Sequence, residues 1–250
     1  MTLHILTKAS SSWNEISVLE ATQLYGEMGK FRFLQFSDHA VQGAIDLKNP
    51  QRIVLEYPRA MMHLMEFNRP SFDSVFMIGH GIGTIPGHYP DKQFTVAEID
   101  EKVVEISKAF FDYRLDNVVI GDGRDILSRQ QPEALDYIIV DAFTKKGTPL
   151  HLMTTEFFDM TANKLAPHGA VLLNLMGRAN HDKLLHAVHT TLRQTYAYTT
   201  VFCLPGRDAA DLCNMILMGS HKPAGYKPKS LAGFVEIELD HGYVMMDNTF

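Results

Sequence analysis

Glycines and carboxylates recur where short apolar runs of this sequence end. These residues are Gly79, Gly81, Gly83, Glu98, Asp122 and Asp141. A glycine lets the backbone approach a ligand closely because no Cβ stands in the way, and a carboxylate can accept hydrogen bonds from both hydroxyls of a ribose. Parallel strands end at the same edge of a sheet, so the pattern predicts a nucleoside-binding cleft at that edge.

The glycine loop differs from that of dinucleotide-binding proteins. A dinucleotide fingerprint opens a substantial helix whose N-terminus faces a pyrophosphate. Here Pro86, Gly87 and Pro90 leave room for barely one helical turn before the next apolar run. A nicotinamide-dependent oxidoreductase is therefore not expected. The acidic strand ends suit an adenosine that carries a cationic sulfonium better.

Alternating strand and helix patterns must position these residues. Apolar runs predict strands at residues 75–78, 94–97, 118–120, 137–140 and 170–175, a closing pair at 198–204 and 214–218, and a last strand-like piece at 233–239. Helical spacing predicts helices at about residues 101–111, 154–165 and 182–195, the first with Asp100 as N-cap. The fold class predicted is α/β, with a doubly wound, mostly parallel seven-stranded sheet.

The N-terminal segment has a different pattern. Alternating runs at residues 15–19 and 30–36, with turn signals between them, predict a small antiparallel β-hairpin unit that ends at Pro50. Residues 52–67 predict a helix into the main domain, with Pro58 in its first turn. We therefore expect a β unit of residues 1–50 and a nucleoside-binding domain of residues 51–250.

The amino-acid composition limits the classes of partner that the protein is expected to bind. The 250 residues carry a net charge of −6 without a dense Lys/Arg run, which argues against nucleic acid and anionic membranes as partners. Neither a signal pattern nor a membrane-length apolar run occurs, and Cys203 and Cys213 suggest no disulfide framework, so we expect a cytoplasmic protein. His186 and His189 lack a carboxylate at ligand spacing, so no metal is expected.

From about residue 52 to 218 the chain resembles the spermidine synthase (polyamine aminopropyltransferase) family, a branch of the class I S-adenosylmethionine-dependent methyltransferase superfamily, whose fold is Rossmann-like. The residues that carry the resemblance are Ile78–Thr84, Val96–Asp100, Gly121–Gly123 and Val140–Phe143. The likeness extends to a branch of the family that reads L-x-Y-x-R-x-M before the glycine loop and D-A-F…P-x-H-L-x-T after the fourth strand. The matching residues are Leu55, Tyr57, Arg59 and Met61, then Asp141–Phe143, Pro149, His151, Leu152 and Thr154.

The resemblance implies S-adenosylmethionine or its decarboxylated form as co-substrate, bound by Gly79, His80, Gly81, Gly83, Glu98, Ile99, Asp122 and Gly123. Glu98 would hold the ribose hydroxyls and Asp122 the adenine amine. Asp141 would be the general base that accepts a proton from the attacking amine. The small-molecule acceptor would contact Gln42, Tyr57, Arg59 and Thr144, and the family likeness also implies a homodimer.

Three positions depart from the polyamine synthases. Ile82 stands where the glycine loop carries an Asp, Thr144 stands where a second Asp meets the diamine, and Arg59 replaces a Glu. Replacing anions near a polycation weakens its binding, which predicts a degenerate polyamine site. The leading hypothesis is an aminopropyl (or related alkyl) transferase. The alternatives are a methyltransferase, which Ile82, Thr144 and Arg59 favour, and a non-catalytic nucleoside-binding protein.

Overall fold

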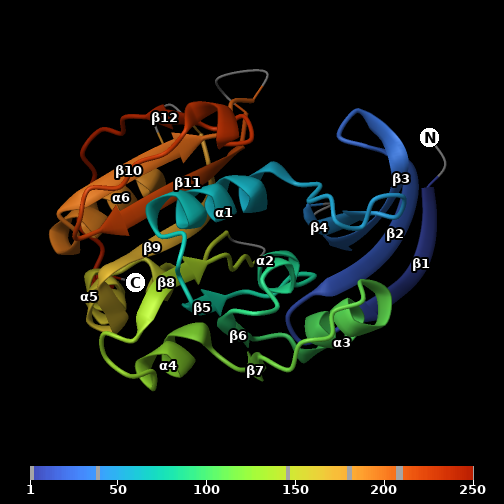
Figure 1. The fold of residues 1–250 in the computed structure, drawn as a ribbon, viewed down its shortest axis with the longest axis horizontal. Helices are drawn as coiled ribbons and strands as arrows, with labels where there is room; N and C mark the ends of the chain where they lie inside the picture. Colours follow the sequence, from blue (N-terminus) through green and yellow to red (C-terminus); the bar gives the residue numbers. More distant parts are fainter. Residues whose placement is uncertain (1–2, 38–39, 145–146, 179–181, 207–210, 250) are drawn as a thin grey trace.

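The computed structural model describes residues 3–37, 40–144, 147–178, 182–206 and 211–249 and contains two sheets (Figure 1). The N-terminal sheet is antiparallel, with four strands in chain order. They are β1 (Leu3–Ser10), β2 (Glu15–Leu24), β3 (Glu27–Phe36) and β4 (Val41–Asp46). The predicted N-terminal hairpin unit is therefore confirmed.

The second sheet is mixed and mostly parallel. Its strands are β5 (Ser74–Ile78), β6 (Gln93–Glu98), β7 (Val118–Ile120), β8 (Leu135–Val140), β9 (Leu165–Gly177), β10 (Tyr198–Cys203), β11 (Cys213–Ser220) and β12 (Val235–Ile237). Their order is β12-β10-β11-β9-β8-β5-β6-β7, and β5 to β9 are parallel while the last three pair antiparallel. The predicted doubly wound α/β class is confirmed.

The sheet differs from the prediction in two places. It has eight strands rather than seven among the described residues, because residues 235–237 pair with the edge of β10. Strand β9 begins at Leu165 rather than residue 170 and runs through Pro167, since the chain already pairs with β8 there, across an irregular register. Short or irregular pairing of this kind leaves little periodic signal in a sequence.

Helices cover both faces of this sheet. They are α1 (Glu56–Asn68), α2 (Thr84–His88), α3 (Glu101–Phe110), α4 (Gly123–Ser128), α5 (Thr155–Lys164) and α6 (Lys183–Thr195), with short 3-10 turns η1 (Leu150–Leu152), η2 (Pro228–Ser230) and η3 (Asp247–Thr249). Along β5, Val75 and Met77 pack with α1 and α2, whereas Phe76 and Ile78 pack with α4, α5 and α6. Alternate side chains thus enter two cores, which explains the continuous apolar run.

The predicted helices at residues 52–67, 101–111, 154–165 and 182–195 are present, within a few residues at their ends, as α1, α3, α5 and α6. Asp100, Thr154 and Asp182 cap the last three through side-chain oxygens that accept backbone N–H groups. Pro58 lies in the first turn of α1, where a missing N–H costs nothing. Helix α4 was not predicted, because six residues are too few for an apolar stripe.

The N-terminal sheet packs against α3 through an apolar cluster. Its buried members are Ile16, Val18, Leu34, Ile82, Val103, Ile106 and Phe111. Polar contacts add to it: the Ser11 hydroxyl donates to the Asp100 carboxylate at 2.6 Å, and Arg32 donates to the carbonyl of Phe110 at 2.8 Å. The division of the chain at residue 50 stays a prediction, with this cluster as the contact between its two parts.

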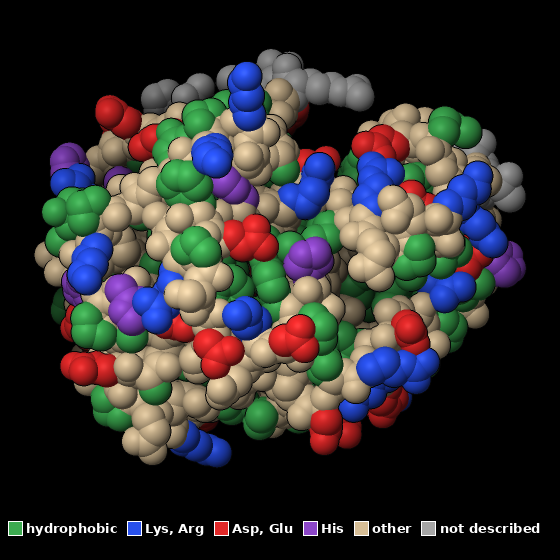
Figure 2. Space-filling view, in the orientation of Figure 1, with side chains coloured by type: hydrophobic (Ala, Val, Ile, Leu, Met, Phe, Trp, Pro, Cys, Tyr) green, Lys and Arg blue, Asp and Glu red, His purple; other side chains and the backbone are tan. Residues whose placement is uncertain are grey.

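Other features bear on location and partners. No helix in the described ranges is long and apolar enough to cross a membrane. Basic and acidic side chains are interspersed over the face shown in Figure 2. Cys203 and Cys213 are buried and free. The cytoplasmic location and the homodimer stay predictions.

Candidate active site

A cavity of about 1110 Å³ opens at the carboxyl edge of the parallel strands. Its lining includes these residues predicted from the sequence: Gly79, His80, Gly81, Glu98, Ile99, Asp122, Gly123, Asp141, Gln42, Tyr57 and Thr144. The lining does not include two predicted residues, Gly83 and Arg59. The strand ends thus bring the predicted nucleoside and base residues together around one space.

The glycine loop depends on the absence of side chains at two positions. Gly79 has φ +96°, and a Cβ there would lie 2.0 Å from the carbonyl oxygen of Asp141. The end of β5 therefore touches the end of β8 directly. Gly83 has φ +78°, and its Cβ would lie 2.2 Å from the ring of Tyr113. Gly83 serves packing beneath the loop, which explains why it does not line the cavity.

Glu98 at the end of β6 is buried and ties the loop to the start of α3. One carboxylate oxygen accepts the backbone N–H of His80 at 2.8 Å, and the other accepts that of Asp100 at 2.9 Å. Burial raises the pKa of Glu98, while these hydrogen bonds lower it in part. The backbone of Ile99 also contacts this carboxylate, which has about four lone-pair sites, so acceptor capacity remains for a ligand hydroxyl.

His80 contributes to the site mainly through its backbone. Its ring is buried, with Nε2 2.8 Å from the Ser107 hydroxyl, which itself donates to the carbonyl of Val104. Nε2 must therefore carry the hydrogen. Burial lowers the pKa of His80 to about 4, so the imidazole is neutral near pH 7.

Asp122 has two roles at once. It is the N-cap of α4, where Oδ1 accepts the backbone N–H groups of Arg124 and Asp125 at 2.9 and 3.1 Å. Its Oδ2 lies 3.0 Å from Nε2 of His151, and both residues line the cavity. From the sequence, His151 is only a motif residue, and its contact with Asp122 identifies it as part of the site.

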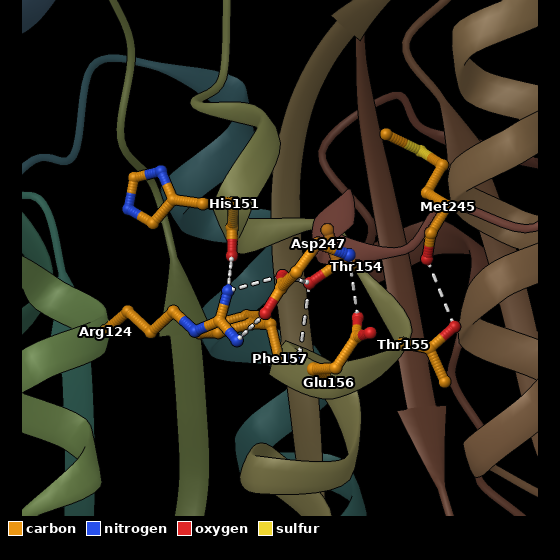
Figure 3. Close-up of polar contacts among 8 residues, drawn as sticks. All are labelled: Arg124, His151, Thr154, Thr155, Glu156, Phe157, Met245 and Asp247. Carbon is orange, nitrogen blue, oxygen red and sulfur yellow. Dashed lines mark hydrogen bonds and ion pairs between the residues drawn. The ribbon is translucent and has the colours of Figure 1, made fainter. Parts of the chain in front are cut away.

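The C-terminal segment contacts the elements that carry Asp122 and His151 (Figure 3). The Arg124 guanidinium donates to both carboxylate oxygens of Asp247, at 2.7 and 2.6 Å, and to the carbonyl of His151 at 3.0 Å. Thr154 donates to Asp247 at 2.7 Å, and the hydroxyl of Thr155 donates to the carbonyl of Met245 at 3.1 Å. Residues far apart in sequence thus hold α4, η1 and α5 together.

Asp141 at the end of β8 is an acid of the cavity that side-chain donors hold. Its carboxylate accepts a hydrogen bond from Nδ2 of Asn174 at 2.8 Å and one from the Tyr57 hydroxyl. Burial raises its pKa to about 6, although both donors lower it in part. The pKa of Tyr57 is raised well above 10.0, so Tyr57 remains a donor. Near neutral pH, Asp141 is mostly ionised and can accept a proton.

Sequence reasoning missed Asn174 and its neighbour Asn214. Asn174 lies on β9, and its Oδ1 accepts a hydrogen bond from Nδ2 of Asn214 on β11 at 3.1 Å. Both line the cavity. A polar residue inside the apolar run of residues 170–175 was the available signal, because a buried amide needs partners.

Not all residues predicted to contact the acceptor line the cavity. Gln42 and Thr144 line the cavity, and the Thr144 hydroxyl donates to the carbonyl of Gly147 at 2.8 Å. Arg59 lies exposed on α1, where it pairs with Glu56 at 3.4 Å. Glu56 lines the cavity instead. The lysines that follow Thr144, residues 145 and 146, lie outside the described residues.

Ile82, the departure in the glycine loop, lies in the contact between the two sheets. It is 5% exposed, within the cluster that joins the N-terminal sheet to α3. A Cβ on Gly43 of β4 would lie 2.6 Å from its side chain. Ile82 therefore packs the N-terminal sheet against the loop and does not line the cavity.

The charged residues that line the cavity are acidic, and many of its other residues are apolar. Among the described residues its charged lining is Glu56, Glu98, Asp122 and Asp141, without a Lys or Arg. Apolar residues of the lining from β9 onward are Met176, Leu204, Pro205, Leu212 and Ala232. An acid-lined space with apolar walls favours a cationic ligand that has an uncharged body. In the described part of the chain no three His, Cys, Asp or Glu side chains are grouped to hold a metal ion.

Known proteins resemble this chain in sequence and in fold. Putrescine N-methyltransferase 2 of Nicotiana attenuata is 31% identical over 166 residues, which cover 60% of this chain and 45% of that protein. A polyamine aminopropyltransferase of Vibrio vulnificus is 29% identical over 171 residues, 64% of this chain and 56% of that one. The chain thus spans about half the length of these relatives.

The fold has a solved counterpart. The crystal structure of a probable spermidine synthase from Corynebacterium glutamicum matches with a TM-score of 0.75 at 21% identity, covering 86% of this chain and 80% of that one. The family model described as the spermine/spermidine synthase domain matches residues 55–224. That range holds the glycine loop, the acidic strand ends and Asp141, and the chain therefore belongs to the spermine/spermidine synthase domain family.

Proposed function

We propose that this protein is a spermidine synthase-like transferase that binds S-adenosylmethionine or decarboxylated S-adenosylmethionine and transfers an aminopropyl or related alkyl group to an amine. The observation that carries the proposal is the Asp141 carboxylate. It faces an acid-lined cavity, is held by two donors and has a pKa of about 6. Such a group is mostly ionised near pH 7 yet basic enough to accept a proton from an amine.

The residues fit the nucleoside part of the co-substrate. Gly79 lets the end of β5 lie directly against the end of β8, because any side chain there would strike the carbonyl of Asp141. Glu98 would hold the ribose hydroxyls with the lone pairs that its backbone contacts leave free. Asp122, with His151 beside it, would hold the adenine amine. When bound, the co-substrate supplies a carbon attached to a cationic sulfur.

In the proposed transfer, the amine, the sulfonium and Asp141 each have one task. The amine nitrogen forms a bond to that carbon, the carbon–sulfur bond breaks, and its electron pair leaves with sulfur as a neutral thioether. The amine proton passes to Asp141. The four carboxylates of the lining favour the positive charges of sulfonium and amine over neutral competitors.

The acceptor would lie beside Asp141 and apolar residues of the lining. Tyr57 and Gln42 line the same space, and Glu56 offers a carboxylate that a second ammonium group could pair with. Arg59 is exposed and bonded to Glu56, so it would affect the acceptor only through that residue. An amine with an aliphatic body and a second ammonium group fits this lining.

Methyl transfer is the second candidate, and the lack of a carboxylate in the glycine loop favours it. A carboxylate that faced the co-substrate would repel the carboxylate of intact S-adenosylmethionine, whereas Ile82 is apolar and packs between the two sheets. The relatives with names that state methyl transfer to putrescine support the same reading. The two chemistries would share Asp141 as base and differ in the co-substrate.

Calorimetric titration of the purified protein with S-adenosylmethionine, its decarboxylated form and methylthioadenosine tests the proposal first. Tighter binding of the decarboxylated form supports aminopropyl transfer, and preference for the intact form supports methyl transfer. Product masses over an amine panel then identify the group transferred. Binding without turnover of any amine supports the third alternative, a non-catalytic nucleoside-binding protein, and no binding contradicts the cleft itself.

A further inference from the structure

Two asparagines form a line of hydrogen bonds behind Asp141. Nδ2 of Asn214 on β11 donates to Oδ1 of Asn174 at 3.1 Å, and Nδ2 of Asn174 on β9 donates to Oδ1 of Asp141 at 2.8 Å. The three residues come from adjacent strands, since β11 pairs with β9 and β9 pairs with β8. Asn174 is only 1% exposed, so its amide depends on these protein partners.

The line fixes which end of the Asn174 amide faces the base. An asparagine amide has a donating nitrogen and an accepting oxygen. A turned Asn174 amide would place its oxygen against the Asp141 carboxylate and its nitrogen against the nitrogen of Asn214. Both new contacts would be repulsive. Because Asn214 donates to the oxygen of Asn174, the nitrogen is left for Asp141.

We propose that Asn174 is a positioning residue that orients and stabilises the ionised Asp141 carboxylate, and that Asn214 acts through it by fixing the direction of the Asn174 amide. The proposal rests on the function proposed above only in calling Asp141 the base. Holding one carboxylate oxygen from β9 leaves the remaining lone pairs of Asp141 for the acceptor amine.

The surroundings of Asp141 make a hydrogen-bond donor important for stabilising its charge. Tyr57 on α1 is the second donor to the carboxylate. The other titratable groups that line the cavity are Tyr25, Glu56, His80, Glu98, Asp122 and His151. In the described lining no Lys or Arg offsets the charge of Asp141. Neutral hydrogen-bond donors must therefore stabilise the ionised carboxylate, as a cation does in many active sites.

The test is a carboxyl ¹³C NMR titration of Asp141 in the ligand-free protein, with the resonance assigned from Asp141→Asn. The midpoint is expected near pH 6 in the parent. Losing a hydrogen bond to a charged group should raise it by roughly one to two pH units in Asn174→Leu. Asn214→Leu should give a smaller rise, because Asn174 can still donate but is no longer held.

A double variant and a control test whether Asn214 acts through Asn174. If Asn214 acts only through Asn174, the double variant Asn174→Leu/Asn214→Leu should titrate at the midpoint of Asn174→Leu alone. Met176→Leu, on the same strand and lining the same cavity, should leave the midpoint unchanged. An unchanged midpoint in Asn174→Leu, or an additive effect of the second substitution, overturns the proposal.

The titration needs neither substrate nor turnover, so it gives a result even if the proposed transfer activity fails. Should Asn174→Leu fold poorly, Asn174→Thr and Asn214→Leu carry the same test. Where turnover is found, the rising limb of kcat/KM against pH should move upward with the NMR midpoint in each variant. A loss of kcat/KM without that movement would indicate a merely structural role and would contradict the proposal.

Discussion

Ionising Asp141 should cost the folded protein stability. Its pKa is about 6 in the folded state against an ordinary 3.8, because burial disfavours the charge. The folded state therefore holds the proton more tightly than the unfolded chain, and stability falls as pH rises between these two values. A difference of about two pKa units corresponds to about 3 kcal/mol at neutral pH.

Asp141→Asn removes this titration while nearly conserving the shape of the side chain. The substitution keeps one oxygen that can accept from Nδ2 of Asn174 and places an amide nitrogen where the other carboxylate oxygen was, a change whose cost does not depend on pH. The stability of the variant minus that of the parent should therefore be constant below about pH 4, rise by about 3 kcal/mol, and level off near about pH 7. Catalysis, where present, should fall by about 10²- to 10⁴-fold at pH 7.

Urea unfolding of both proteins at intervals of pH measures this difference directly. Subtracting the two curves cancels every group that titrates equally in both, so only Asp141 and its immediate neighbours contribute. A difference that stays flat across the range would show that the Asp141 carboxylate is not perturbed in the folded state. It would also remove the physical basis for a base that is poised near neutral pH.

Three further changes test the packing around the site. Gly79→Ala should lower the free energy of unfolding by at least about 2 kcal/mol more than Gly26→Ala. Both glycines have positive φ, but a Cβ on Gly79 would meet a backbone carbonyl, whereas a Cβ on Gly26 meets nothing within 4 Å. Equal losses in urea unfolding would refute that close approach. Ile82→Asp should destabilise by about 3 kcal/mol or more, because it buries a carboxylate in the apolar cluster; a near-neutral effect would mean that the carboxylate reaches the cavity. Arg124→Met should cost only about 1 kcal/mol, because Asp247 is more than a third exposed. Arg124 lowers the pKa of Asp247, so the ion-pair contribution is present at neutral pH and should fade as the pH falls below about 4. The hydrogen bond from Arg124 to the carbonyl of His151 does not titrate. Thermal unfolding against pH measures the loss, and a loss as large in acid as at neutral pH would contradict the ion pair.

The order of elements and the nucleoside edge could be read from the sequence because their causes are local. A strand buried on both faces must be apolar throughout, and a loop that passes close to another strand needs glycine, as Gly79 does against Asp141. Parallel strands end at one edge, so Glu98 and Asp122 had to converge there with Asp141. These features require no knowledge of distant partners.

Tertiary structure decided what those residues contact. The turn of α1 directs Glu56 into the cavity and leaves Arg59 exposed, although both stood in the same motif region. The partner of Asp141 is 33 residues away on β9, and that of Arg124 is 123 residues away at the C-terminus. A hydrogen bond or ion pair of that separation leaves no periodic signal, because only the pairing of strands and the docking of the chain ends bring its two groups together.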